Sequence, residues 1–292
     1  MANSELVSRG HASACPLGWG CTVTLAAGFR ERLAESAAAN RSQLVVGLDV
    51  TPESLPAHLS RDAHGVLTFN RAVVESTADL VSGYKLNFAF FQALGAEGWE
   101  VLYATRRLIP RRLLTIADAK LGDIGNSSKL YAKAVFGDLD FDAVTLSPYV
   151  GREGLQPFLD QASKGSFILC RTSNRDGSLQ DVETGGASLY ERVASTVAEW
   201  GPNAGLVVGA TDIGALRRVR ELAPEAPLLV PGVGAQGGNL EATIDSLRGG
   251  GPALIAMSRA VILSSGGPDF ATAARDAAER FARAMPAEWA AA

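Results

Sequence analysis

The chain has 292 residues, of which 47% are hydrophobic and 20% are charged, and its formal net charge is −4. This hydrophobic content is enough for a large core, and the net charge gives no reason to expect a nucleic-acid or membrane partner. No apolar run approaches the roughly 18 residues of a transmembrane helix. We therefore expect a globular protein, and α/β barrels of about 250 residues form single domains.

The first 22 residues are polar, Gly-rich and poorly periodic, and they lack the apolar stretch and basic lead of a signal peptide. We expect a disordered N-terminal extension at residues 1–22 and one catalytic domain over residues 23–292. Three cysteines, Cys15, Cys21 and Cys170, form an odd set without the spacing of metal ligands. This cysteine usage favours a reducing, cytoplasmic setting.

Beyond the extension, a helix is expected at about Ala26–Ala39, followed by eight strand-like runs. Segments with helical spacing, such as Tyr190–Glu199 and Gly214–Leu222, separate these runs. Strands that alternate with helices pair in parallel through right-handed crossovers. The pattern predicts a single (β/α)8 TIM barrel whose N-terminal helix precedes strand one and covers the barrel floor. The expected strands are Gln43–Val50, Leu80–Asn87, Leu113–Lys120, Ala143–Pro148, Phe167–Ser173, Gly205–Ala210, Leu228–Val233 and Leu254–Arg259.

A charged motif ends the third of these strands. Asp118 and Lys120 are two residues apart and point to the same side of an extended chain, and Asp123 follows Gly122, where the chain can turn. Charges at the mouth of a buried sheet are costly to desolvate, and catalytic groups of barrels lie at the carboxyl ends of strands. The motif therefore predicts a catalytic site. The alternative is an ion pair followed by a solvated loop.

A Gly-rich run at residues 231–238 ends the seventh strand, and Arg259 ends the eighth. Successive backbone N–H groups of such a run can form an anion-binding nest. Barrels often hold phosphate in the loops after strands seven and eight, where Arg259 adds a charged contact. These two strand ends predict a phosphate site, and the alternative for the Gly-rich run is a tight surface turn.

Taken together, these motifs resemble the signature of orotidine 5′-phosphate decarboxylase, in the bacterial branch often called type 2. The resemblance extends from about Phe29 to Phe281. It is carried by residues 46–49, 85–91, 118–120, 123–124, 171–174 and 231–237. It implies that the chain decarboxylates orotidine 5′-phosphate to uridine 5′-phosphate without a cofactor, which is the last step of de novo pyrimidine nucleotide synthesis.

The resemblance also implies the catalytic residues. Lys85, Asp118, Lys120 and Asp123 would form a charged tetrad, with Asp123 donated across a homodimer interface by the partner subunit. Lys120 would stabilise the negative charge that develops on C6 of the pyrimidine and then protonate that carbon. Asp118 would lie near the departing carboxylate.

Further residues are implied to bind the substrate. Asp49 would bind the ribose hydroxyls, Ser173 the pyrimidine edge, and Gln236 and Arg259 the phosphate. Ile124 and Ser127 would cross the interface together with Asp123. The sequence departs from the family pattern at Leu121, Ser127 and Ser258, where relatives commonly have Arg, Thr and Gly; the last change would alter the geometry of the phosphate loop.

Two alternatives stay open at this point. A magnesium-dependent sugar-phosphate decarboxylase or aldolase of the same superfamily shares the motif of the third strand, but such enzymes carry a metal-binding carboxylate where this chain has Lys85. The other alternative is a non-catalytic barrel that binds phosphosugars or nucleotides, which the complete tetrad disfavours. No cluster of carboxylates and histidines suggests a metal. The polar, Gly-rich segment Arg175–Gly186 is the best candidate for a lid, and the alternative is a long surface loop.

Overall fold

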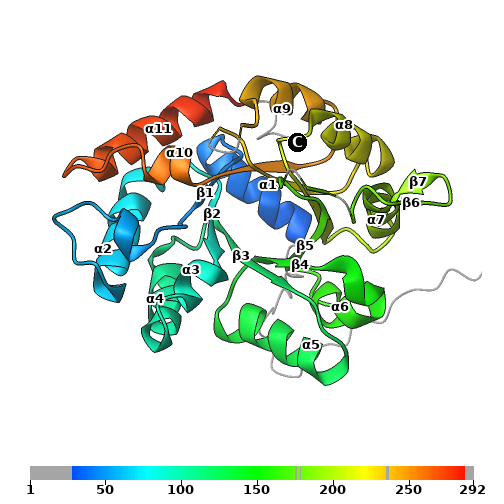
Figure 1. Cartoon of the computed structure of the whole chain (residues 1–292), viewed down its shortest axis with the longest axis horizontal. Helices are drawn as coiled ribbons and strands as arrows, with labels where there is room; N and C mark the ends of the chain where they lie inside the picture. Colours follow the sequence, from blue (N-terminus) through cyan, green and yellow to red (C-terminus); the bar gives the residue numbers. More distant parts are fainter. Residues whose placement is uncertain (1–27, 175, 178, 235–236, 287–292) are drawn as a thin grey trace, which may run out of the picture.

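The computed structural model describes residues 28–174, 176–177, 179–234 and 237–286 (Figure 1). The expected extension at residues 1–22 lies outside these ranges. Eight parallel strands form a closed barrel in the order β1-β10-β9-β8-β5-β4-β3-β2. The strands are β1 (Leu44–Gly47), β2 (Gly83–Asn87), β3 (Leu114–Leu121), β4 (Ala143–Leu146), β5 (Gly165–Arg171), β8 (Ala204–Val208), β9 (Leu228–Pro231) and β10 (Ala253–Met257). The predicted TIM barrel is therefore confirmed, with strand ends that differ from the expected ones by a few residues.

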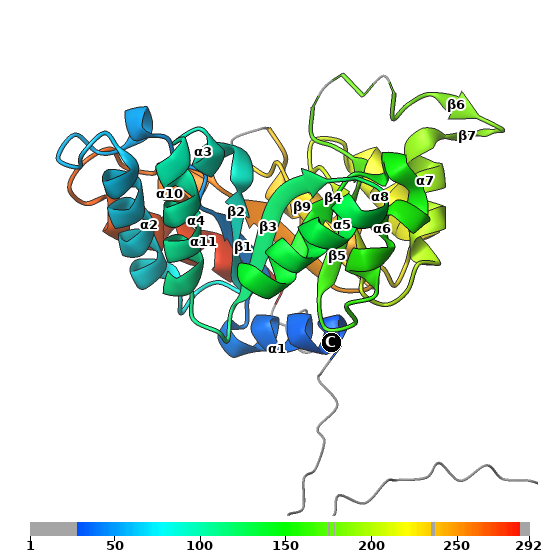
Figure 2. The same ribbon diagram turned by 90° about the horizontal axis from the view of Figure 1, so that it is seen from below.

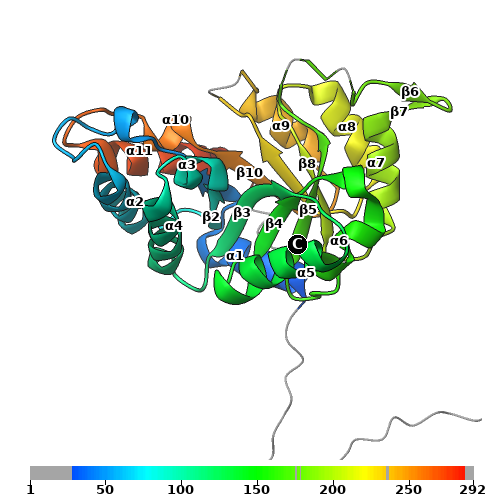
Figure 3. The same ribbon diagram turned by 60° about the horizontal axis from the view of Figure 1, so that its bottom comes forward.

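Helices surround the strands on the outside of the barrel (Figure 3). The longer ones are α2 (Ala63–Thr77), α4 (Ala96–Leu108), α5 (Gly125–Ala132), α6 (Gly151–Leu159), α7 (Leu189–Ala198), α8 (Ile213–Leu222), α9 (Leu240–Leu247) and α11 (Phe270–Ala284). Shorter segments are α3 (Phe88–Gln92), α10 (Arg259–Ile262), the 3-10 turns η1 (Pro52–Ser54) and η3 (Pro148–Val150), and the π-helical turn η2 (Lys133–Asp138).

Local sequence explains where these helices begin and which face they bury. The carboxylate of Asp62 accepts a hydrogen bond from the Gly65 N–H at 2.9 Å and so caps the first turn of α2. In α11, Phe270, Ala274 and Ala278 are buried. Their spacing of four residues places them on one side of the helix, which packs against α2.

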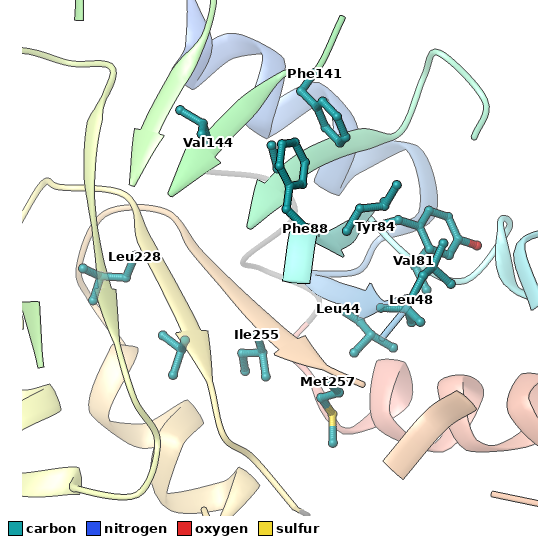
Figure 4. Packing of buried hydrophobic residues seen from close by; sticks show 14 of the residues in the cluster. Leu44, Leu48, Val81, Tyr84, Phe88, Phe141, Val144, Leu228, Ile255 and Met257 are labelled. Atoms are coloured by element: carbon teal, nitrogen blue, oxygen red, sulfur yellow. The ribbon is translucent and has the colours of Figure 1, made fainter. Parts of the chain in front are cut away.

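Helix α1 (Phe29–Asn40) lies across one end of the barrel, as predicted, although Ala26 lies outside the described residues (Figure 2). Its Phe29 and Leu33 belong to a buried cluster that fills the barrel interior, and the rings of Phe29 and Phe167 pack edge to face at 5.8 Å. A second, larger cluster lies between the strands and the outer helices. Figure 4 shows part of it, including Tyr84 and Ile255. Since α1 closes the floor, the opposite end of the barrel is the one available for a site.

A two-stranded antiparallel hairpin, β6 (Glu183–Thr184) and β7 (Ala187–Ser188), lies at that opposite end (Figure 2). It occupies part of the segment that the sequence indicated as a lid. None of the helices in the described ranges has the length and apolar character that crossing a lipid bilayer demands.

Candidate active site

A cavity of about 290 Å³ lies at the carboxyl ends of the barrel strands, where barrel enzymes place their catalytic groups. Side chains from several strand ends line it, so residues distant in sequence meet there. The predicted site residues that line it are Asp49, Lys85, Asp118, Lys120, Ser173 and Arg259. The predicted Gln236 lies outside the described residues. Three other predicted residues, Asp123, Ile124 and Ser127, belong to the described chain but do not line the cavity.

Four of these side chains form a row of alternating charge. The Nζ atom of Lys85 lies 3.2 Å from Oδ2 of Asp49 and 2.8 Å from Oδ2 of Asp118. The Nζ atom of Lys120 lies 2.5 Å from the other carboxylate oxygen of Asp118. The side chains of Lys85 and Asp118 are only 7% and 11% exposed, whereas that of Lys120 is 48% exposed. Lys120 is therefore the cation that an incoming ligand can cover.

The mutual pairing offsets the cost of burying these charges. Burial disfavours the ionised form of Asp118, but the two neighbouring ammonium groups of Lys85 and Lys120 outweigh it and lower the pKa of Asp118 to about 2. Burial likewise disfavours the charged form of Lys85, and the carboxylates of Asp49 and Asp118 outweigh it and raise the pKa of Lys85. The array therefore keeps its buried charges at neutral pH.

Among the cavity residues that were not predicted as site residues, Thr145 and Ser258 contact the charged row directly. Thr145 of β4 donates a hydrogen bond from its hydroxyl to Oδ1 of Asp118 at 3.1 Å. The hydroxyl of Ser258 donates to Oδ2 of Asp49 at 2.6 Å. The serine at position 258, where relatives commonly have Gly, therefore contacts Asp49, the residue expected to bind the ribose. The sequence signal for Thr145 was a polar residue inside an apolar run, and for Ser258 it was the position directly before Arg259.

In the described part of the Gly-rich loop after β9, three N–H groups of the expected anion nest bond within the loop. The N–H groups of Gly234, Gly237 and Gly238 donate to carbonyl oxygens within the loop at 2.8–3.1 Å, so they do not point together at a ligand. Gly232 and Val233 line the cavity beside Arg259, which begins α10 directly after β10. Arg259 therefore remains the main candidate for binding an anion at this end of the cavity.

The hairpin segment is tied to the carboxyl end of β5. The side-chain amide of Gln180 accepts a hydrogen bond from the Thr172 N–H at 2.9 Å and donates one to the Thr172 hydroxyl at 2.7 Å. Arg171 contacts the carboxylate of Asp181 at 3.2 Å. Thr172 and Ser173 line the cavity. A movement of the hairpin segment would therefore displace residues of the cavity wall.

The segment after β3 does not line the cavity of its own chain. The carboxylate of Asp123 accepts a hydrogen bond from the N–H of Ile124 at 2.8 Å, and the side chain of Ile124 is 67% exposed. Ser127 is exposed on α5. No group of three or more His, Cys, Asp or Glu residues suited to hold a metal ion occurs in the described ranges.

Comparison with known proteins identifies the family of this chain. Residues 42–276 match the model of the orotidine 5′-phosphate decarboxylase / HUMPS family. A relative from Dehalococcoides mccartyi, named orotidine 5′-phosphate decarboxylase, is 46% identical over 268 residues, which cover 88% of this chain and 97% of the relative. A relative of the same name from Herpetosiphon aurantiacus is 46% identical over 260 residues, which cover 87% of this chain and 96% of the relative.

A solved structure has the same fold. The structure of Leishmania donovani OMP decarboxylase matches with a TM-score of 0.75 and 37% sequence identity, over 87% of this chain and 98% of that one. The sequence and the barrel fold thus match one family over nearly the whole length of these relatives.

Proposed function

The chain belongs to the orotidine 5′-phosphate decarboxylase / HUMPS family, and we propose that it converts orotidine 5′-phosphate to uridine 5′-phosphate and carbon dioxide. This reaction completes de novo pyrimidine nucleotide synthesis. The observation that carries the proposal is the row Asp49, Lys85, Asp118 and Lys120 in one cavity. Such fixed charges suit a reaction in which charge moves from a carboxylate to a ring carbon.

The mechanism follows from the positions of these groups. The bond between C6 of the pyrimidine and its carboxylate breaks, carbon dioxide leaves, and the electron pair remains on C6. Lys120 stabilises this developing charge, because a preorganised cation that bound substrate shields from water is worth far more than one in water. Lys120 then donates a proton from Nζ to C6. Asp118 holds Lys120 in place next to the departing carboxylate, and Lys85 balances the charge of Asp118.

We assign the remaining roles around this centre. Asp49 binds the ribose hydroxyls, and its Oδ1 atom supports this role because it is buried without a hydrogen-bond partner in the described residues. Ser173 binds the pyrimidine edge. Arg259, together with Gln236, binds the phosphate through charged hydrogen bonds, and binding energy gained there lowers the barrier at C6.

The active enzyme in this proposal is a homodimer in which Asp123, Ile124 and Ser127 reach the partner subunit's cavity. The exposure of Ile124 supports this arrangement, and so does the 96% exposure of Tyr149 on the neighbouring turn η3. An exposed apolar surface of this kind commonly marks an interface. Further exposed apolar side chains on α4 and α5 are Trp99, Tyr103, Leu130 and Tyr131.

The proposed reaction needs no metal or organic cofactor, because Lys85 and Lys120 supply the positive charge. A cytoplasmic location is also part of the proposal. It is supported by Cys170, a free thiol buried in β5, whose pKa is raised to about 12 by burial.

Loss of the ultraviolet absorbance of orotidine 5′-phosphate on addition of the purified protein tests the proposed function, with product identified as uridine 5′-phosphate by chromatography. The competing activity of the family is tested in parallel with sugar phosphates and magnesium. Turnover of sugar phosphates, without turnover of orotidine 5′-phosphate, would replace the proposal by the metal-dependent activity.

A further inference from the structure

Thr145 occupies an unusual position in the pairing of β3 with β4. Ala117 of β3 pairs with Val144 of β4, and the next paired residues are Leu121 and Leu146. Residues 118–120 of β3 therefore lie opposite Thr145 alone. A strand that bulges in this way loses regular ladder hydrogen bonds, and its backbone groups need other partners.

The Thr145 hydroxyl contacts both ends of the bulge, the backbone at one end and a side chain at the other. It accepts a hydrogen bond from the N–H of Lys120 at 2.9 Å, and it donates its own proton to Oδ1 of Asp118 at 3.1 Å. A hydroxyl has one donor and two acceptor positions, so a single group can make both bonds at once. The Thr145 residue is 1% exposed, which excludes water as a ready substitute.

The backbone of Lys120 needs such support. Its φ angle is 50°, in the left-handed region that residues other than glycine seldom adopt. A backbone held there costs energy and persists only where surrounding contacts fix it. The same conformation places Nζ of Lys120 at 2.5 Å from Asp118. Without the hydroxyl, residues 118–120 could relax towards a regular strand and move the ammonium group.

We propose that Thr145 is a positioning residue, whose hydroxyl holds the bulge at residues 118–120 so that Asp118 and Lys120 keep their catalytic geometry. The expected effect on catalysis rests on the proposed function, whereas the role of the hydroxyl in holding the bulge does not. Thr145 acts through Asp118 and Lys120, so its loss should lower the rate of the chemical step more than the affinity for nucleotide.

The test compares Thr145→Val, which keeps the shape and removes the hydroxyl, with Thr145→Ser, which keeps the hydroxyl. For orotidine 5′-phosphate, we expect kcat of the Val variant to fall about tenfold to a hundredfold, as small misplacements of catalytic groups do. Its affinity for uridine 5′-phosphate should change less than about threefold, and the Ser variant should retain most of the wild-type kcat.

Thr115→Val is the matched control. Thr115 is also 1% exposed, and its hydroxyl donates to Asp142 at 2.8 Å near the other end of β3, away from the cavity. This variant should lose stability but keep kcat. Equal losses of kcat in the variants at 115 and 145, or an undiminished kcat in Thr145→Val, would overturn the proposal.

A crystal structure of Thr145→Val gives a second readout that does not depend on the reaction. We expect the φ angle of Lys120 to leave the left-handed region and the contact between Lys120 and Asp118 to lengthen. Unchanged conformation at residues 118–120 would overturn the proposal, even if the wild-type protein did not act on orotidine 5′-phosphate. Failure of the proposed function itself would appear separately, as absence of wild-type turnover.

Discussion

The Nζ atom of Lys120 lies 2.5 Å from Oδ1 of Asp118, and both residues belong to a backbone bulge in which Lys120 has a left-handed φ angle. The carboxylate of Asp118 thus contacts two ammonium groups at once, because its second oxygen lies 2.8 Å from Nζ of Lys85. This arrangement ties the ionisation of Asp118 to the folded state, and that link can be measured.

The pH dependence of stability should reveal this link. Ionised Asp118 has a folded pKa lowered to about 2 from an ordinary value of 3.8, so its stabilisation is fully present above about pH 4. It is lost as the pH falls through the folded pKa, and the full effect is about 2 kcal/mol. Between pH 5 and pH 3, the free energy of unfolding should therefore fall less steeply for Asp118→Asn than for wild type.

Denaturant titrations at several pH values measure these slopes at a fixed protein concentration. Asp138→Asn, which changes an exposed carboxylate, serves as the control and should keep the wild-type slope. The pKa of Lys85 is raised and lies far above this range, so Lys85 adds nothing to the comparison. Identical slopes for wild type and Asp118→Asn would contradict the lowered pKa.

Turnover should survive removal of metal ions. The end of β2 carries the ammonium group of Lys85 between two carboxylates, and this group would repel a divalent cation. The rate with orotidine 5′-phosphate should be the same before and after prolonged treatment with EDTA. Loss of activity with EDTA and its return with magnesium would favour the metal-dependent members of the family instead.

Arg259→Ala should weaken the binding of phosphorylated nucleotides. Removing a charged hydrogen bond costs about 1.5–3 kcal/mol, so Kd for uridine 5′-phosphate should rise about tenfold to a hundredfold. Uridine, which lacks the phosphate, should bind the variant and the wild type equally well. Arg111→Ala, at a side chain that is 91% exposed, is the control and should leave both affinities unchanged. Calorimetry that found equal losses for both ligands would show that Arg259 does not bind the phosphate.

Mixing two inactive variants should restore activity if the sites are shared between subunits. Lys120→Ala and Asp123→Ala homodimers should each be nearly inactive. After random subunit exchange, each hybrid dimer has one site with both lesions and one site with neither, so about a quarter of all sites should be intact. If activity stays at the homodimer level while mass measurements confirm exchange, Asp123 does not cross the interface.

Local sequence patterns were sufficient to predict the barrel and most of the cavity. The alternation of strands with helices fixed the topology, and the carboxyl ends of parallel strands meet at one rim, which brings Asp49, Asp118 and Arg259 together. The helix at the barrel floor could also be predicted, because its apolar residues, including Phe29 and Leu33, precede the first strand.

The finer geometry could not be predicted, because it depends on contacts between distant segments. Ser258 and Asp49 are 209 residues apart, so no local pattern indicates their hydrogen bond. The bulge that sets the backbone of Lys120 arises from pairing with β4, and it appears only when the register is known. The Gly-rich loop was predicted as an anion nest, but Gly234 and Gly238 use their N–H groups within the loop.

The central claim is that the charged array around Lys120 decarboxylates orotidine 5′-phosphate, and kinetics of the wild type and Lys120→Ala with this substrate test it most directly. We predict that the wild type forms uridine 5′-phosphate and carbon dioxide in equal amounts. The variant should lose roughly a thousandfold or more in kcat, because it lacks both the stabilising charge and the proton donor, while still binding uridine 5′-phosphate. A wild type without turnover, or a variant with undiminished kcat, would contradict the account.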